Sequence, residues 1–76
     1  MNIEEALDTY EKYSYIAQSA AQTLSTEEAE KIVNILEEAK NVCLSQPDED
    51  KLMILLKMQA INLKIALKIQ NQIINN

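Results

Sequence analysis

Residues 52–74 read LMILLKMQAINLKIALKIQNQII, and this stretch decides the fold. Its only charges are three lysines, and it has no glycine or proline to interrupt a helix. At about 100° per residue, its apolar side chains fall on two sides of a helix. One side holds Met53, Leu56, Ala60, Leu63, Leu67 and Ile74. The other side holds Ile54, Leu55, Met58, Ile61, Ile65, Ala66, Ile69 and Ile73.

A helix at the surface of a globular protein normally buries one apolar stripe about 100° wide. This helix has about twice that width, so a second element has to cover its second side. Two helices formed by the preceding residues could flank it, or another chain could cover one side. The sequence leaves open which side faces the protein's own chain.

The composition predicts an all-α fold in one domain, residues 1–76. The chain has no glycine, one proline and 47% hydrophobic residues, whereas sheets and hairpin turns usually require glycine. We predict three helices over residues 3–23, 26–45 and 48–74. They should pack as a helical hairpin or a small three-helix bundle with a long C-terminal helix.

Local signals place the helix starts. Asn2 can cap the first helix, and Ser25 with Glu28 forms the capping box that begins the second. Pro47 pushes the preceding residue out of the helical region and fits the first turn of the third helix. The breaks between the predicted helices follow from these residues.

Few residues suggest chemistry. The chain has no histidine and a single cysteine, Cys43, which we expect to be a small buried apolar residue. The acids at 48–50 suit a helix start, and those at 4, 8 and 11 suit a solvated helix face. We therefore expect no catalytic residues, no metal site and no cofactor, and we do not expect an enzyme.

Charge divides the chain. Residues 1–50 hold all 12 acidic residues and three lysines, a net charge of −9, while residues 51–76 hold four lysines and no acid, a net charge of +4. This favours acidic helices beside a basic one. Without arginine, nucleic-acid binding is not expected, and the lysines argue against membrane insertion. An unpaired thiol and the lack of a signal peptide favour a cytoplasmic location.

Residues 51–54 and 60–69, which follow a proline-acid turn and a shorter acidic helix, resemble the C-terminal helix of the small co-chaperones of type III secretion needle subunits. The resemblance covers about residues 30–75. It implies a helical hairpin that joins a larger helical-repeat chaperone and holds the needle subunit unpolymerised in the bacterial cytoplasm. The chain departs from that pattern by carrying a substantial helix before the hairpin.

These observations favour a non-enzymatic interaction module, an adaptor or co-chaperone that binds a partner through one apolar side of the last helix. The partner is either a different protein or a second copy of the chain. The alternative is a small acidic inhibitor of the phage or plasmid type, which binds a basic protein. Tyr15 is expected to point away from Tyr10, either as an interface anchor or as a cap on the core. The predicted partner-binding residues are Ile54, Met58, Ile61, Ile65, Ile69 and Tyr15.

Overall fold

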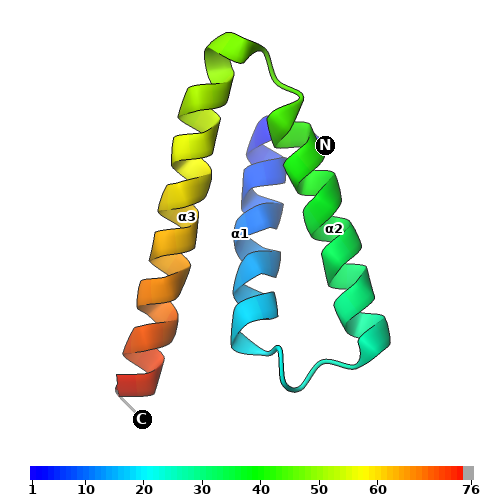
Figure 1. The fold of residues 1–76 in the computed structure, drawn as a ribbon, viewed down its shortest axis with the longest axis vertical. Helices are drawn as coiled ribbons and strands as arrows, with labels where there is room; N and C mark the ends of the chain where they lie inside the picture. Colours follow the sequence, from blue (N-terminus) through cyan, green and yellow to red (C-terminus); the bar gives the residue numbers. More distant parts are fainter. Residues whose placement is uncertain (75–76) are drawn as a thin grey trace.

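The computed structural model describes residues 1–74, which form three helices and, within that range, no strand. They are α1 (Ile3–Ser19), α2 (Thr26–Leu44) and α3 (Asp48–Ile74). Figure 1 shows that α2 runs antiparallel to both α1 and α3. The predicted all-α, three-helix fold is confirmed.

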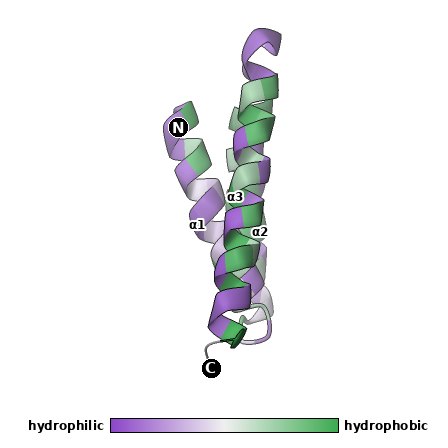
Figure 2. Cartoon of the chain, turned by 90° about the vertical axis from the view of Figure 1, so that its left-hand side faces the viewer, coloured by the Kyte–Doolittle hydropathy of each residue, from purple (hydrophilic) through white to green (hydrophobic). Residues whose placement is uncertain are grey.

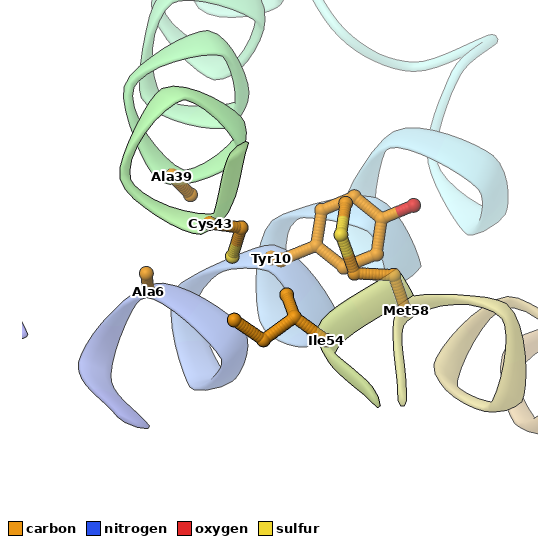
Figure 3. Packing of buried hydrophobic residues seen from close by; sticks show 6 residues of the cluster. All are labelled: Ala6, Tyr10, Ala39, Cys43, Ile54 and Met58. Atoms are coloured by element: carbon orange, nitrogen blue, oxygen red, sulfur yellow. The ribbon is translucent and has the colours of Figure 1, made fainter. Parts of the chain in front are cut away.

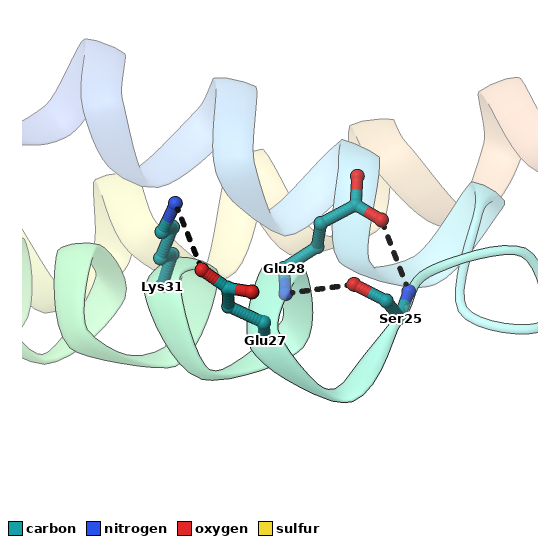
Figure 4. A network of polar contacts seen from close by, with 4 residues as sticks. All are labelled: Ser25, Glu27, Glu28 and Lys31. Carbon is teal, nitrogen blue, oxygen red and sulfur yellow. Dashed lines mark hydrogen bonds and ion pairs between the residues drawn. The ribbon is translucent and has the colours of Figure 1, made fainter.

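The helix starts form as the local signals predict. Asn2 Oδ1 accepts a hydrogen bond from the backbone N–H of Glu5 at 2.8 Å. Ser25 Oγ accepts from the N–H of Glu28, and Glu28 Oε1 accepts from the N–H of Ser25, each at 3.1 Å (Figure 4). The hydrogen bonds from the Ser25 backbone and hydroxyl hold the pKa of the Glu28 carboxyl below its usual value, because they stabilise the charged form.

The first helix is shorter than predicted: α1 ends at Ser19 rather than at residue 23. The hydroxyl of Ser19 donates to the carbonyl of Tyr15 at 2.7 Å. Beyond it, both the N–H and the hydroxyl of Thr23 donate to the carbonyl of Ala20 at 3.0 Å, which closes a turn. Side-chain hydrogen bonds of this kind compete with the helical pattern and favour a turn. The observed ends of α2 and α3 lie within one residue of the predicted ends.

The core lies where the start of α1, the end of α2 and the first half of α3 meet. Small side chains of α1 and α2, together with the Tyr10 ring of α1, face larger aliphatic ones of α3 there, and Cys43 is fully buried, as predicted (Figure 3). The cluster consists of Ala6, Tyr10, Ala39, Cys43, Ile54 and Met58. The small residues let the helices approach closely, so that the isoleucine and methionine fill the space between them.

The three helices form a flattened assembly. α1 contacts both α2 and α3, whereas α2 and α3 contact each other least. α2 and α3 lie close together at the end that holds their connection and diverge toward the other end, with α1 between them (Figure 1). The start of α1 leans out of the plane of the other two helices (Figure 2). The Cα extents are 42 × 29 × 13 Å. A layer this thin covers α3 on one side only.

Candidate interaction surface

The side of α3 that was predicted to bind a partner faces the protein's own core. Ile54, Met58 and Ile65 are buried, with 7%, 8% and 2% of their surface exposed. Ile61 and Ile69 on the same side are half-buried. The five residues are therefore not an exposed docking face: α1 packs against α3 on this side, and α2 joins it in the core around Ile54 and Met58. We call this the inner side of α3.

Polar contacts at one flank support this orientation of α3. The Tyr10 hydroxyl donates to Asn62 Oδ1 at 2.8 Å, across the contact between α1 and α3. Tyr10 itself is buried, and its ring belongs to the core. A rotation of α3 that exposed its inner side would break this hydrogen bond and empty the core.

Tyr15, the remaining predicted partner-binding residue, lies against the C-terminal half of α3. The Lys68 ammonium group lies 4.5 Å from the centroid of the Tyr15 ring, and the Tyr15 hydroxyl accepts a hydrogen bond from Gln72 Nε2 at 2.6 Å. Cation–π and hydrogen-bond contacts of this kind hold α3 to α1 near the open end of the assembly. Tyr15 is half-buried by these contacts rather than presented outward as an anchor.

The opposite side of α3 is exposed along its whole length. Leu56, Leu63 and Leu67 expose 52%, 63% and 52% of their surface. Figure 2 views the molecule from the α3 side and shows hydrophobic segments recurring along the helix. We name this surface the outer stripe, which consists of Met53, Leu56, Ala60, Leu63, Leu67 and Ile74.

The spacing of the outer stripe is regular. From Met53 its members follow one another at intervals of three and four residues, and Gln70 occupies the one polar position in the series. This is the heptad pattern of a helix that packs along another helix. Because about 3.5 residues separate successive members, the stripe stays on one face over roughly six turns.

One edge of the outer stripe is basic. Lys57 and Lys64 follow the stripe at heptad spacing on the side that adjoins α1, and we call them the lysine edge. Lys64 Nζ lies 3.3 Å from Glu11 Oε2, in a pair that is largely open to solvent. Among the described residues, Lys57 makes no salt bridge. Exposed ion pairs of this kind contribute little to stability, so the lysine edge is available to other acids.

A small apolar hollow lies where α1 ends and α2 begins. Its volume is about 160 Å³. The lining residues are Ala17, Ala21, Leu24, Ala29, Ile32, Val33 and Leu36. That volume is comparable with cavities that hold one aromatic ring. The hollow is thus a second, much smaller apolar feature, separate from α3.

The reactive side chains are scattered. Burial raises the pKa of the Cys43 thiol, which disfavours its nucleophilic thiolate. Glu11, one of the acids that align on α1, pairs with Lys64. Residues 1–74 contain no group of three side chains arranged to hold a metal ion. In the same range, no helix is both long enough and apolar enough to cross a membrane.

The sequence prediction recognised the leucine side of α3 but did not assign it to a partner. The regular spacing of Leu56, Leu63 and Leu67 was visible in the sequence, but the inner side shows a similar spacing at Ile54, Met58, Ile61 and Ile65. Periodicity therefore identifies two apolar seams but does not show which of them is buried. The lysines do not decide between them, because Lys57 and Lys64 lie between the two sides on the helix.

Comparison with known proteins adds no relative: no family model, curated protein or solved structure matches the chain.

Proposed function

We propose that the protein is a small non-enzymatic interaction module, an adaptor or co-chaperone, that binds a different protein through the outer stripe of α3. The observation that carries the proposal is the outer stripe itself, an exposed apolar series on a well-formed helix that includes Leu56, Leu63 and Leu67. Burying a large apolar side chain is worth roughly 1.5–3 kcal/mol, so several half-exposed leucines leave on the order of 5 kcal/mol unused in the isolated chain. A partner helix or groove that covers the stripe recovers this energy.

The type III secretion resemblance supplies one candidate setting for this role. There the protein would act in the bacterial cytoplasm as a co-chaperone and bind a helical-repeat chaperone. Two features support this setting. α3 exposes an apolar side, and an assembly of this kind needs a helix with such a side for contact with the chaperone. The proposal itself rests on the outer stripe and holds for other helical partners.

Substitution of the outer stripe tests the proposal. Leu63→Asp should abolish capture of the partner from an extract of the native host while leaving the helical circular-dichroism signal intact, because Leu63 is 63% exposed. The matched control is Val33→Asp on α2, where the apolar side chain is 51% exposed. The control should keep the partner, and the mass of the intact complex should give its stoichiometry.

Two results would overturn the proposal. One is a complex that tolerates Leu63→Asp as well as it tolerates Val33→Asp. The other is a wild-type chain that captures no protein and binds no dye specific for apolar surfaces.

The acidic alternative predicts a different salt dependence. α2 exposes Glu30, Glu37 and Glu38, which could contact a basic protein. A complex made through those acids weakens steeply as ionic strength rises, and Val33→Asp would not weaken it. A complex made through the outer stripe keeps most of its affinity in salt and fails with Leu63→Asp.

A further inference from the structure

The spacing of the outer stripe constrains the shape of its occupant. Members three and four residues apart follow a left-handed helical seam, and the natural complement of such a seam is another helix that runs nearly parallel or antiparallel to it. Gln70 interrupts the apolar series once, near the C-terminal end. The occupant is therefore a helix with its own heptad seam.

The exposed area matches one half of an interface. The chain has 5602 Å² of accessible surface and a mass of 8.6 kDa. A folded monomer of that mass exposes about 4,700 Å². The excess of about 900 Å² is close to the roughly 800 Å² that each partner buries in a standard interface. One helix laid along the outer stripe accounts for an area of this size.

The charges beside the stripe disfavour a second copy of the chain as the occupant. In an antiparallel pair of α3 helices, the two lysine edges would meet and repel each other. In a parallel pair, the lysine edge would meet the opposite edge of the other helix, formed by Leu52, Gln59 and Ala66, which carries no acid. In neither orientation does the facing α3 offer a carboxylate, because α3 has no acidic residue after Asp50.

We infer that the outer stripe binds an amphipathic helix of another protein, one that carries a leucine-type heptad seam bordered by aspartate or glutamate. The seam fills the stripe, and the acids pair with Lys57 and Lys64. An acid opposite Lys64 shares that lysine with Glu11, which already lies 3.3 Å away. This inference rests on the proposed function and adds the chemical class of the partner.

Two synthetic helical peptides test the inference. Each has about four heptads with leucine at both seam positions, and the flanking positions carry glutamate in one peptide and lysine in the other. Binding of each labelled peptide to the full chain is measured by fluorescence anisotropy at about 50 mM and about 500 mM salt. The glutamate peptide should bind about tenfold more tightly than the lysine peptide at low salt, and the difference should shrink at high salt.

Variants of the full chain supply the controls. The double substitution Lys57→Glu with Lys64→Glu should reverse the preference between the peptides, since both side chains are exposed and their replacement leaves the core intact. Leu63→Asp should abolish binding of both peptides. Lys31→Glu on α2, whose side chain is also exposed, should change neither affinity.

The outcomes separate the inference from the proposed function. Equal affinity for the two peptides, or an unchanged preference in the double variant, overturns the acidic partner but leaves a Leu63-dependent interaction module. A wild-type chain that sediments at twice its mass, with Leu63→Asp restoring the monomer, makes a second copy the occupant and likewise overturns the inference. If neither peptide binds and Leu63→Asp has no effect on capture from the host extract, the proposed function itself fails.

Discussion

The inner and outer sides of α3 have similar composition, but one is buried and the other is exposed. Ile65 exposes 2% of its surface and Leu63, two residues earlier, exposes 63%. Both are aliphatic, both belong to a heptad-like series, and both lie in the middle of the same helix. Their difference shows that hydrophobicity alone does not choose the buried side of a helix.

Shape explains the difference. The inner side meets alanines and a cysteine of α1 and α2, which leave room for isoleucine and methionine to pack closely (Figure 3). The two shorter helices make one layer and cannot enclose α3 from both sides. Once the inner side is packed, the leucines are left to solvent or to a partner.

The largest expected effect on stability comes from truncating one side chain on each side of α3. Ile65→Ala should destabilise the protein by about 2–5 kcal/mol, because it removes buried methyl groups and leaves a cavity. Leu63→Ala should change the free energy of unfolding by less than about 0.5 kcal/mol, because the side chain is already in water. Urea unfolding followed by circular dichroism measures both. Equal losses would show that the two sides do not differ in the free protein.

Thiol reactivity should differ by at least about tenfold between the core that the inner side packs against and the outer stripe. Cys43 lies in the core and has no exposed surface, so an alkylating reagent reaches it only when the helices open. A thiol placed on the outer stripe, Leu63→Cys in a Cys43→Ala background, should react at the rate of an unstructured peptide. Labelling of Cys43 at that same rate would mean that the core opens freely.

The pH dependence of the Cys43 thiol has a definite sign. Burial raises its pKa above the ordinary value of 9.0, because the charged thiolate loses its hydration. Its contribution to stability is therefore complete below the pKa of the unfolded thiol, and it is lost as the pH rises through the pKa of the folded one. Cys43→Ala should remove this alkaline loss, which denaturant titrations of both proteins above pH 9.0 would detect.

Loss of a hydrogen bond between α1 and α3 beside the inner side should have a smaller effect on stability. Tyr10→Phe removes the 2.8 Å hydrogen bond to Asn62 and should cost about 1 kcal/mol. Tyr15→Phe removes the hydrogen bond from Gln72, which is exposed, and should cost less. Thermal unfolding of the two variants compares them directly. A larger loss in Tyr15→Phe would place the main α1–α3 contact at the open end instead.

Much of the fold could be predicted because it depends on local chemistry. Ser25 and Glu28 form the predicted capping box, and Pro47 separates α2 from α3 as expected. The end of α1 was the exception: the prediction continued the helix to residue 23, while hydrogen bonds from Ser19 and Thr23 end it earlier. Such side-chain to backbone bonds compete closely with the helix, so sequence pattern alone does not decide between them.

The candidate site could be predicted only in part. The sequence identified α3 as the helix with two apolar sides, but the isoleucines that it assigned to a partner are buried, at Ile54 and Ile65, or half-buried, at Ile61 and Ile69. The residues that form the exposed surface, such as Leu56 and Leu67, were recognised as one of the two sides without being assigned to the partner. An assignment between the sides required the positions of Ala6, Ala39 and Cys43 in space.

The sequence by itself therefore determined the three helices, their starts and the excess of apolar surface on the last of them. These properties come from hydrogen bonds and periodicities within a few residues, which a linear pattern records. The tertiary structure decided which side of α3 is inner and which is outer. That choice depends on how side chains from three separate helices fit together, and only the packed helices bring those side chains into contact.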